Sequence, residues 1–509
     1  MSRSALPSPA QLTALVNACL MPAYPGRVPP AWLLRALDEG MAGVGLFGTN
    51  LTPADGVAHG SLREDVAEPL RAVRPDVLIA LDEEGGDVTR LDYLRGSAYP
   101  GNHALGAVDD TALTREVAGA IGSDLVAEGI NLCLGPCADV NSQPDNPIIG
   151  VRAFGADPAL VARHTAAFVE GLQEHRVAAT LKHFPGHGDT GVDSHDALPD
   201  IDRPLDALNA VELPPFAAGA AAGAKAVMTG HIRLPHLAEL PATLSRRVVT
   251  GLLREQLGYD GVVITDALEM APVRDRWGFG GAAVLAWAAG TDLVLLGPSG
   301  DDRALPEVYA AVESALRKGE LTVERLQEAA ARVAALRAWA TAVPTSGASA
   351  DVGLRAARRA LAATGDVAPA PGTAWHTVRL LSEANMAVGT APWGLEQPLA
   401  RLGLLASATD VEPGADPTTV SLPAGGPVAV VVRDAARDPW QRTALHALRA
   451  RRPDLVAVEM GLHEARDEDA PNATLRDDAV LYTRGAGLAN AVAAAELLTG
   501  HSWLGPLRT

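Results

Sequence analysis

Residues Val177–Pro199 read VAATLKHFPGHGDTGVDSHDALP and show in one stretch how much of this chain is built. A short apolar run, Val177–Leu181, leads directly into Lys182 and His183 and then into a loop that contains three glycines. An apolar run that ends in charged residues is typical of a strand buried on both faces, with a site at its carboxyl end. The same arrangement recurs from the N-terminus to about Ala340.

Eight apolar runs of this kind alternate with segments that have helical periodicity. We expect strands at Val16–Met21, Val44–Phe47, Val77–Leu81, Asn131–Leu134, Val177–Leu181, Ala226–Thr229, Val262–Thr265 and Leu293–Leu296. We expect helices at Ala31–Asp38, Leu62–Val73, Leu113–Glu128, Leu160–Glu174, Leu205–Ala222, Arg246–Gln256, Gly281–Ala289, Leu305–Lys318 and Val323–Ala340. Eight buried parallel strands separated by helices predict an α/β protein with a (β/α)8 TIM barrel, and an open doubly wound sheet is the alternative.

After the barrel pattern, two stretches rich in Pro, Gly and Ser or Ala interrupt the chain. They lie at Val343–Ser349 and Gly365–Gly372, with a helix expected between them at Leu354–Ala363. A new α/β pattern follows, with strands expected at Val428–Val432, Leu455–Val458 and Val480–Tyr482 and helices at Trp440–Arg449 and Leu488–Leu498. We therefore predict a catalytic barrel over residues 1–343, a linker region with one helix over 344–372 and a smaller α/β domain over 373–509.

Charge and cysteine content limit the classes of partner and the compartment. The 509 residues include 42 Lys and Arg against 61 Asp and Glu, a net charge of −19 that repels nucleic acid and anionic membrane surfaces. Three cysteines, Cys19, Cys133 and Cys137, are too few for a disulfide framework and fit a reducing compartment. Without a signal-peptide pattern or an apolar stretch long enough for a bilayer, we expect a cytoplasmic protein with no membrane insertion. The sequence does not indicate an oligomeric state.

Polar side chains follow five of the expected strands at the point where each strand ends. Asp82, Asp139, the pair Lys182 and His183, His231 and Asp266 occupy these positions. Barrel enzymes build their active sites at the carboxyl ends of the strands. We therefore expect these residues to face one common site.

The loop after the fifth strand carries the highest density of titratable side chains. His183, His187 and His195 with Asp189 and Asp193 could ligate a metal, but Pro and Gly residues disfavour the helix that zinc motifs use, so we expect no metal. A polar surface loop is the simpler alternative. Asp193 and His195 are two residues apart, so the carboxylate can orient the imidazole for proton transfer near neutral pH.

Three further segments add candidate residues. Asp266 ends the strand in DGVVITDALEM, where a helix N-cap is the alternative role. Asp82 and Arg90 lie in ALDEEGGDVTRL, and Arg152 lies in the loop NPIIGVRAFG after the fourth strand. Either arginine alone could be a surface charge. Together with Asp82, Lys182 and His183, the two arginines form a hydrogen-bonding set suited to a polyhydroxylated ring and a nearby carboxylate.

The segments DEEGG-x-V-x-RL, KHFPGHGDT-x-x-DSH and TDALEM resemble those of the bacterial β-N-acetylhexosaminidases of glycoside hydrolase family 3, over roughly Leu15–Ala340. The resemblance implies a TIM barrel that hydrolyses terminal β-linked N-acetylglucosamine with retention and without a cofactor. It implies Asp266 as the nucleophile and His195, paired with Asp193, as the acid/base. It assigns sugar binding to Asp82, Arg90, Arg152, Lys182 and His183. Two positions depart from the family pattern: Asp87 stands where Arg is frequent, and Ala267 where an acidic residue is frequent.

The sequence alone leaves several enzymatic activities, and a non-catalytic role, as alternatives. A histidine acid/base is neutral when it acts as a base, which would also suit a phosphorylase that uses inorganic phosphate. A β-glucosidase of the same family is a further alternative, although the DSH segment argues against it. A non-catalytic sugar-binding protein would be expected to lack the nucleophile or the Asp193–His195 pair. Muropeptides and chitooligosaccharides are the expected natural substrates.

Overall fold

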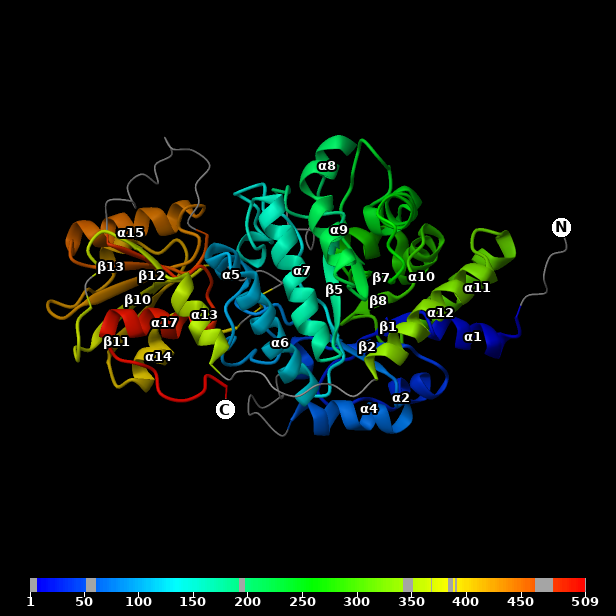
Figure 1. Cartoon of the computed structure of the whole chain (residues 1–509), viewed down its shortest axis with the longest axis horizontal. Helices are drawn as coiled ribbons and strands as arrows, with labels where there is room; N and C mark the ends of the chain where they lie inside the picture. The colour runs from blue at the N-terminus through cyan, green and yellow to red at the C-terminus, as the bar shows by residue number, and fades with distance from the viewer. Residues whose placement is uncertain are drawn as a thin grey trace. The chain divides into compact units, whose positions relative to one another are not determined.

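A computed structural model describes residues 7–51, 61–191, 197–341, 351–367, 369–382, 388–389, 391–462 and 479–508. The chain forms two compact units (Figure 1). The first, which we call the barrel unit, comprises Met1–Glu83, Thr114–Ile148 and Ala156–Ala348. The second unit comprises Glu84–Leu113, Ile149–Gly155 and Ser349–Thr509. The predicted division at 343 and 372 does not include the two early segments of the second unit, and it stays a prediction.

Eight parallel strands form the core of the barrel unit. They are β1 (Leu20–Pro22), β2 (Gly43–Gly45), β3 (Leu78–Leu81), β4 (Leu132–Cys133), β5 (Ala178–Phe184), β6 (Ala226–Thr229), β7 (Val262–Thr265) and β8 (Val294–Gly297). Strands β2 to β7 pair in chain order, β1 pairs with β8, and a bridge between Ile264 and Leu293 joins β7 to β8. Ala42 N donates to Asn17 O at 2.9 Å beside β1 and β2. This sequential parallel order confirms the predicted barrel over the open doubly wound sheet.

Helices cover the outside of these strands, as Figure 1 shows for α7, α9 and α12. The helices are α1 (Pro9–Asn17), α2 (Ala31–Asp38), α3 (Gly48–Leu51), η1 (Arg63–Ala67), α4 (Glu68–Val73), α6 (Thr111–Ala127), α7 (Pro158–Glu174), α8 (Leu205–Val211), α9 (Leu213–Ala221), η3 (Ala242–Leu244), η4 (Arg247–Gln256), α10 (Ala271–Ala289), α11 (Leu305–Lys318) and α12 (Val323–Ala340). Strand residues such as Leu78, Ala178 and Val262 share one buried apolar cluster with Val333 and Leu336 of α12. Burial of this apolar surface is the main term that stabilises the barrel.

Several predicted elements of the barrel differ from the structure in their bounds, among them the helix predicted at Gly281–Ala289, which begins at Ala271. Two of the differences have clear local reasons. Val16 belongs to α1, which extends to Asn17, rather than to the first strand. A capping box starts this helix at Ser8: its Oγ accepts from Gln11 N, and Gln11 Oε1 accepts from Ser8 N. The single helix expected at Leu205–Ala222 is divided at Glu212 into α8 and α9. Two prolines directly after Leu213 have no backbone N–H to donate, which ends α8 there.

The second unit is built on a six-stranded sheet. Its strands are β9 (Ala362–Thr364), β10 (Trp375–Leu380), β11 (Leu405–Val411), β12 (Val428–Val432), β13 (Val456–Glu459) and β14 (Val480–Tyr482). The strand order is β11-β10-β12-β13-β14-β9, and only β9 runs antiparallel to its neighbour among these strands. The helical elements are α5 (Asn102–Val108), η2 (Gly150–Arg152), α13 (Val352–Ala360), α14 (Glu396–Arg401), η5 (Pro417–Thr419), α15 (Pro439–Arg451) and α17 (Leu488–Thr499).

Apolar side chains cover both faces of this second sheet. Val428, Val430 and Val432 point to the face covered by α15, while Ala429 and Val431 point to the face covered by α14 and α17 (Figure 1). This alternation follows from the two-residue period of a strand and explains why β12 is apolar throughout. The chain therefore has the second, smaller α/β fold that was predicted after the barrel pattern.

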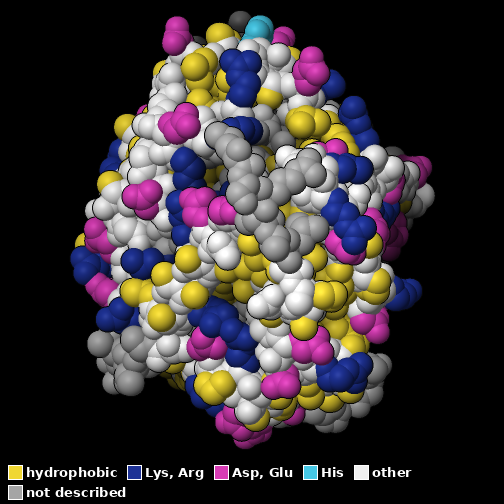
Figure 2. Space-filling view, turned by 90° about the vertical axis from the view of Figure 1, so that its right-hand side faces the viewer, with side chains coloured by type: hydrophobic (Ala, Val, Ile, Leu, Met, Phe, Trp, Pro, Cys, Tyr) yellow, Lys and Arg dark blue, Asp and Glu magenta, His cyan; other side chains and the backbone are white. Residues whose placement is uncertain are grey.

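Within the described part of the chain, no helix is both long enough and apolar enough to cross a bilayer. On the face drawn in Figure 2, Lys and Arg side chains are interspersed with Asp and Glu side chains. Mixed charge of this kind does not build the continuous positive field that attracts a phosphate backbone.

Candidate active site

The predicted polar residues of the barrel unit lie at the carboxyl ends of its strands. Asp82 directly follows β3, and Asp266 directly follows β7. Lys182 and His183 were expected directly after the fifth strand. They instead form part of β5, because the strand continues to Phe184. The carboxyl ends of adjacent barrel strands share one face, so these side chains belong to the same end of the barrel.

Lys182 and Asp82 form an ion pair across β3 and β5. Lys182 Nζ lies 2.6 Å from Asp82 Oδ1, and the Lys182 side chain is only 2% exposed. Burying an ammonium group is costly unless it is paired, and this carboxylate compensates the charge. The alternative interpretation of this segment as a polar surface loop is therefore wrong at Lys182, whose ammonium group is a buried donor held at the end of the barrel.

His183 is held by the fully buried Asp139, from the segment after β4. Asp139 Oδ1 accepts from the backbone N of His183 (3.0 Å) and of His187 (2.7 Å), while Asp139 Oδ2 lies 2.8 Å from His183 Nδ1. Burial alone would raise the pKa of Asp139, but the imidazole of His183 and these hydrogen bonds hold the pKa below its ordinary value. The ionised carboxylate thus fixes both the His183 ring and the start of the PGHG loop.

Cys137 completes a buried group with Asp139 and His183. The ligand atoms of these three side chains lie within 4.8 Å of one another, which is compatible with a metal site in principle. However, Asp139 Oδ2 already accepts from Cys137 Sγ at 3.2 Å and is bonded to His183 Nδ1. The arrangement is explained by hydrogen bonds, and the sequence-based expectation of no metal remains a prediction.

Glu212 lies beneath the same loop and was not among the expected site residues. It is fully buried, its Oε1 accepts from Ser142 Oγ at 3.4 Å, and a Cβ atom on Gly186 would lie 2.5 Å from Glu212 Oε2. Burial, together with the negative charge of Asp139, raises the pKa of Glu212 to about 8. At neutral pH this carboxyl group is therefore mostly protonated and supports the loop without adding charge.

Asp266 is partly exposed at the end of β7. Its Oδ1 accepts from Ala267 N at 2.8 Å, while Met270, rather than Asp266, occupies the N-cap of α10. The N-cap role considered for Asp266 is therefore wrong. The buried His231 holds the next residue, since its Nε2 donates to Ala267 O at 3.0 Å. His231 thus helps to fix the backbone that carries the Asp266 carboxylate.

Arg90 and Arg152 belong to the second unit and are not surface charges. They are 8% and 7% exposed. Arg152 is paired with Glu84 through two hydrogen bonds, Nε to Oε2 at 3.0 Å and Nη2 to Oε1 at 2.8 Å. This fork-to-carboxylate geometry fixes the plane of the guanidinium. Glu84 lies within the DEEGG motif but was not among the site residues predicted from the sequence.

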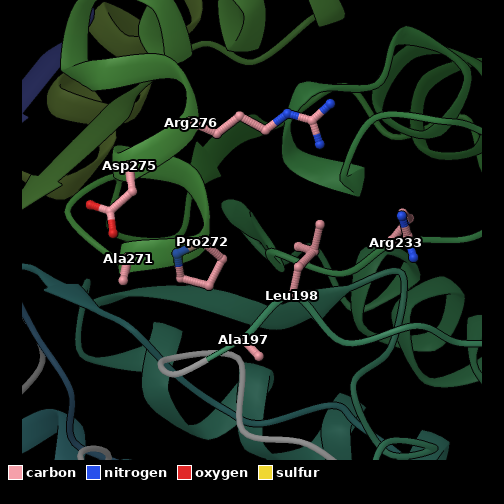
Figure 3. A pocket seen from close by; sticks show the side chains of 7 residues that line it. All are labelled: Ala197, Leu198, Arg233, Ala271, Pro272, Asp275 and Arg276. Atoms are coloured by element: carbon pink, nitrogen blue, oxygen red, sulfur yellow. The ribbon is translucent and has the colours of Figure 1, made fainter.

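Asp193 and His195, the expected proton-transfer pair, lie outside the described residues. Ala197 and Leu198, which follow them in the chain, line an open pocket of about 660 Å³ (Figure 3). Arg233, Ala271, Pro272, Asp275 and Arg276 complete its lining. These residues come from the segments after β5 and β6 and from the start of α10, at the barrel end that carries Asp266.

Similarity to known proteins assigns the chain to one family. The family described as glycosyl hydrolase family 3 N terminal domain matches residues 34–336. Beta-hexosaminidase A of Pseudoalteromonas piscicida is 38% identical over 293 residues, which are 54% of this chain and 48% of that protein. This chain thus matches only about half the length of that relative. A beta-hexosaminidase of Xylella fastidiosa (strain M12) is 38% identical over 267 residues, 51% of this chain and 77% of that one.

A solved structure matches both units of the chain. The glycoside hydrolase family 3 beta-N-acetylglucosaminidase from Paenibacillus sp. str. FPU-7 has a TM-score of 0.82 and 30% identity, and the match covers 99% of this chain and 98% of that one. The chain therefore belongs to glycoside hydrolase family 3, as its motifs indicate.

Proposed function

We propose that this chain is an exo-acting retaining glycoside hydrolase that releases terminal β-linked N-acetylglucosamine. The observation that carries the proposal is the position of Asp266, a partly exposed carboxylate directly after β7 in a barrel of this family. The names of the relatives and of the Paenibacillus structure support the sugar class. An ordered carboxylate at the carboxyl end of a barrel strand is suited to nucleophilic attack.

The proposed reaction has two displacement steps. Asp266 attacks the anomeric carbon and forms an ester bond to it, while the bond to the leaving oxygen breaks and that oxygen takes a proton from His195. Neutral His195 then removes a proton from water, the water oxygen attacks the anomeric carbon, and Asp266 leaves as a carboxylate. Asp193 orients the imidazole in both steps. Two inversions give net retention.

We assign recognition of the sugar to fixed polar side chains. Lys182 supplies a buried charged donor, and Asp82 supplies acceptor oxygens beside it. His183, Arg90 and Arg152 complete the set that the family motifs imply. Charged hydrogen bonds to sugar hydroxyls give orientation as well as affinity, because a mismatched hydroxyl leaves a charged group unsatisfied.

The natural substrates that we propose are muropeptides or chitooligosaccharides, within the cytoplasm. Both carry terminal N-acetylglucosamine in β linkage. Cell fractionation and incubation with each class of oligosaccharide test these two points separately.

A panel of 4-nitrophenyl β-glycosides tests the proposed activity. We expect release of nitrophenol from the N-acetylglucosaminide and little from the glucoside, with the β-anomer as the first sugar product in ¹H NMR. The α-anomer as first product would contradict a retaining mechanism. N-acetylglucosamine 1-phosphate as the main product in phosphate buffer would instead make the chain a phosphorylase. Asp266→Asn is the inactive control.

A further inference from the structure

The carboxyl edge of the second sheet contacts two segments from much earlier in the chain. Residues Glu84–Leu113 and Ile149–Gly155 belong to the same compact unit as the C-terminal residues. The carboxyl edge of a parallel sheet is where α/β proteins usually bind a ligand. Here residues that follow β12 and β14 bind the loop that begins at Glu84, which we call the Glu84 loop (residues 84–92).

Asp87 makes the central contact of the Glu84 loop. Its Oδ2 forms an ion pair with Nη2 of Arg433, the residue directly after β12, and its Oδ1 accepts from the backbone N of Ala486 at 2.7 Å. The Asp87 side chain is 2% exposed and that of Arg433 is 13% exposed. Both carboxylate oxygens are therefore engaged in a site that excludes most water, where such bonds are strong.

Backbone packing around this contact is close. A Cβ atom on Gly487 would lie only 3.1 Å from Gly86 Cα, so the two chain segments approach without side chains between them. Gly86 has a φ of +60°, which favours glycine at this turn. Ala489 N also donates to Ser97 O at 3.0 Å. The C-terminal part of the chain thus holds the Glu84 loop at Gly86 and Asp87, and it also holds Ser97 shortly after the loop.

The two arginines assigned to sugar binding depend on this loop. Arg90 is three residues after Asp87 in the same loop. Glu84, three residues before Asp87, forms the bidentate pair with Arg152, whose carbonyl oxygen also accepts from Asn102 Nδ2 at 2.7 Å. A shift of the loop would therefore displace Arg90 directly and Arg152 through Glu84.

We propose that the C-terminal part of the chain is a positioning element for sugar binding, and that Asp87 and Arg433 are its positioning residues. The proposal rests on the proposed function, since Arg90 and Arg152 are assigned to the sugar there. It gives residues 349–509 a role in substrate affinity, although none of the residues expected to react lies within that range.

The test uses full-length Asp87→Asn and Arg433→Gln variants and the 4-nitrophenyl N-acetylglucosaminide. Each variant removes one charge of the pair. We expect KM to rise about tenfold or more while kcat changes much less, because Arg90 and Arg152 are assigned to binding the sugar in both the ground state and the transition state. The double variant should recover part of the lost affinity, because two neutral amides can hydrogen-bond to each other and the amide at position 87 retains an oxygen for Ala486 N. Arg379→Gln is the matched control, since it removes an Arg379–Asp410 pair of the same unit at β10 and β11.

A purely structural role predicts a different result. The variants would then lower the thermal midpoint and the fraction of active protein, with KM equal to that of the wild type, and this result would overturn the proposal. Calorimetric titration with N-acetylglucosamine adds a readout that does not require turnover: the variants should bind it about tenfold more weakly than wild type and Arg379→Gln. If the wild type hydrolyses the glycoside and the variants bind the sugar as tightly as the wild type, only the positioning role is refuted. If the wild type neither binds nor hydrolyses the sugar, the proposed function is refuted, and this inference is refuted with it.

Discussion

The buried Glu212 carboxyl group makes the stability of the barrel depend on pH in a predictable way. Its pKa is raised from 4.5 to about 8 because the side chain is buried and faces the negative charges of Asp139 and Asp189, which Arg203 offsets only in part. Between these two values the folded chain keeps a proton that the unfolded chain has released. The free energy of unfolding therefore falls as pH rises through this window.

Replacing Glu212 by Gln removes this dependence and keeps the shape of the side chain. One pKa unit corresponds to about 1.4 kcal/mol, so from pH 5 to pH 8 wild type should lose roughly 3–4 kcal/mol of stability relative to Glu212→Gln. Urea unfolding of both proteins at pH 5, 6, 7 and 8 measures this difference. Glu320→Gln, at an exposed position, is the control and should follow the wild-type pH dependence. A constant difference between wild type and Glu212→Gln over this range would show that Glu212 is ionised throughout and would refute the reasoning.

Three further perturbations test other parts of the account. His195→Ala should lose much more activity on poor leaving groups than on nitrophenolate, show a burst with the latter and respond to azide; equal losses on both without rescue would exclude His195 as the acid/base. Lys182→Met removes the ammonium from Asp82 and should cost about 3 kcal/mol of stability in thermal or urea unfolding. In the same variant, loss of a charged hydrogen bond to the sugar should lower kcat/KM by roughly 10–100-fold, and wild-type kinetics would disprove contact with the sugar. Prolonged dialysis against EDTA should leave wild-type activity unchanged, whereas loss of activity and recovery with one divalent ion would contradict the expectation of no metal.

Elements with a strong local pattern could be predicted from the sequence. The bounds of β6, β7, β12, α11 and α12 agree with the predicted ranges, because each is an apolar run or an amphipathic stretch with clear end signals. Strand β11, with the sequence LASATDV, was missed because it lies at the sheet edge and most of its side chains are exposed. An edge strand does not need the continuous apolar pattern that reveals a central one.

The site could be predicted where function depends on position along a strand, and not where it depends on long-range contacts. The ends of the apolar runs and the motif spacing predicted that Asp82, Lys182 and Asp266 lie at one end of the barrel, although β5 extends past Lys182. The pairing of Glu84 with Arg152 joins residues 68 positions apart, and no local pattern encodes it. Glu212 carries no motif either, since its importance comes from burial beneath a loop that lies earlier in the chain. Tertiary packing decides such contacts, and single-sequence patterns do not contain it.

Covalent trapping tests the central claim most directly. The wild-type chain and Asp266→Asn are incubated with a 5-fluoro N-acetylglucosaminyl fluoride, which slows breakdown of a glycosyl-enzyme, and their peptides are analysed by mass spectrometry. The account predicts one added sugar per wild-type chain, on the peptide that contains Asp266, and no added sugar on the variant. A label on a different residue, or no label on a wild-type protein that hydrolyses the N-acetylglucosaminide with retention, would contradict the assignment of Asp266 as the nucleophile.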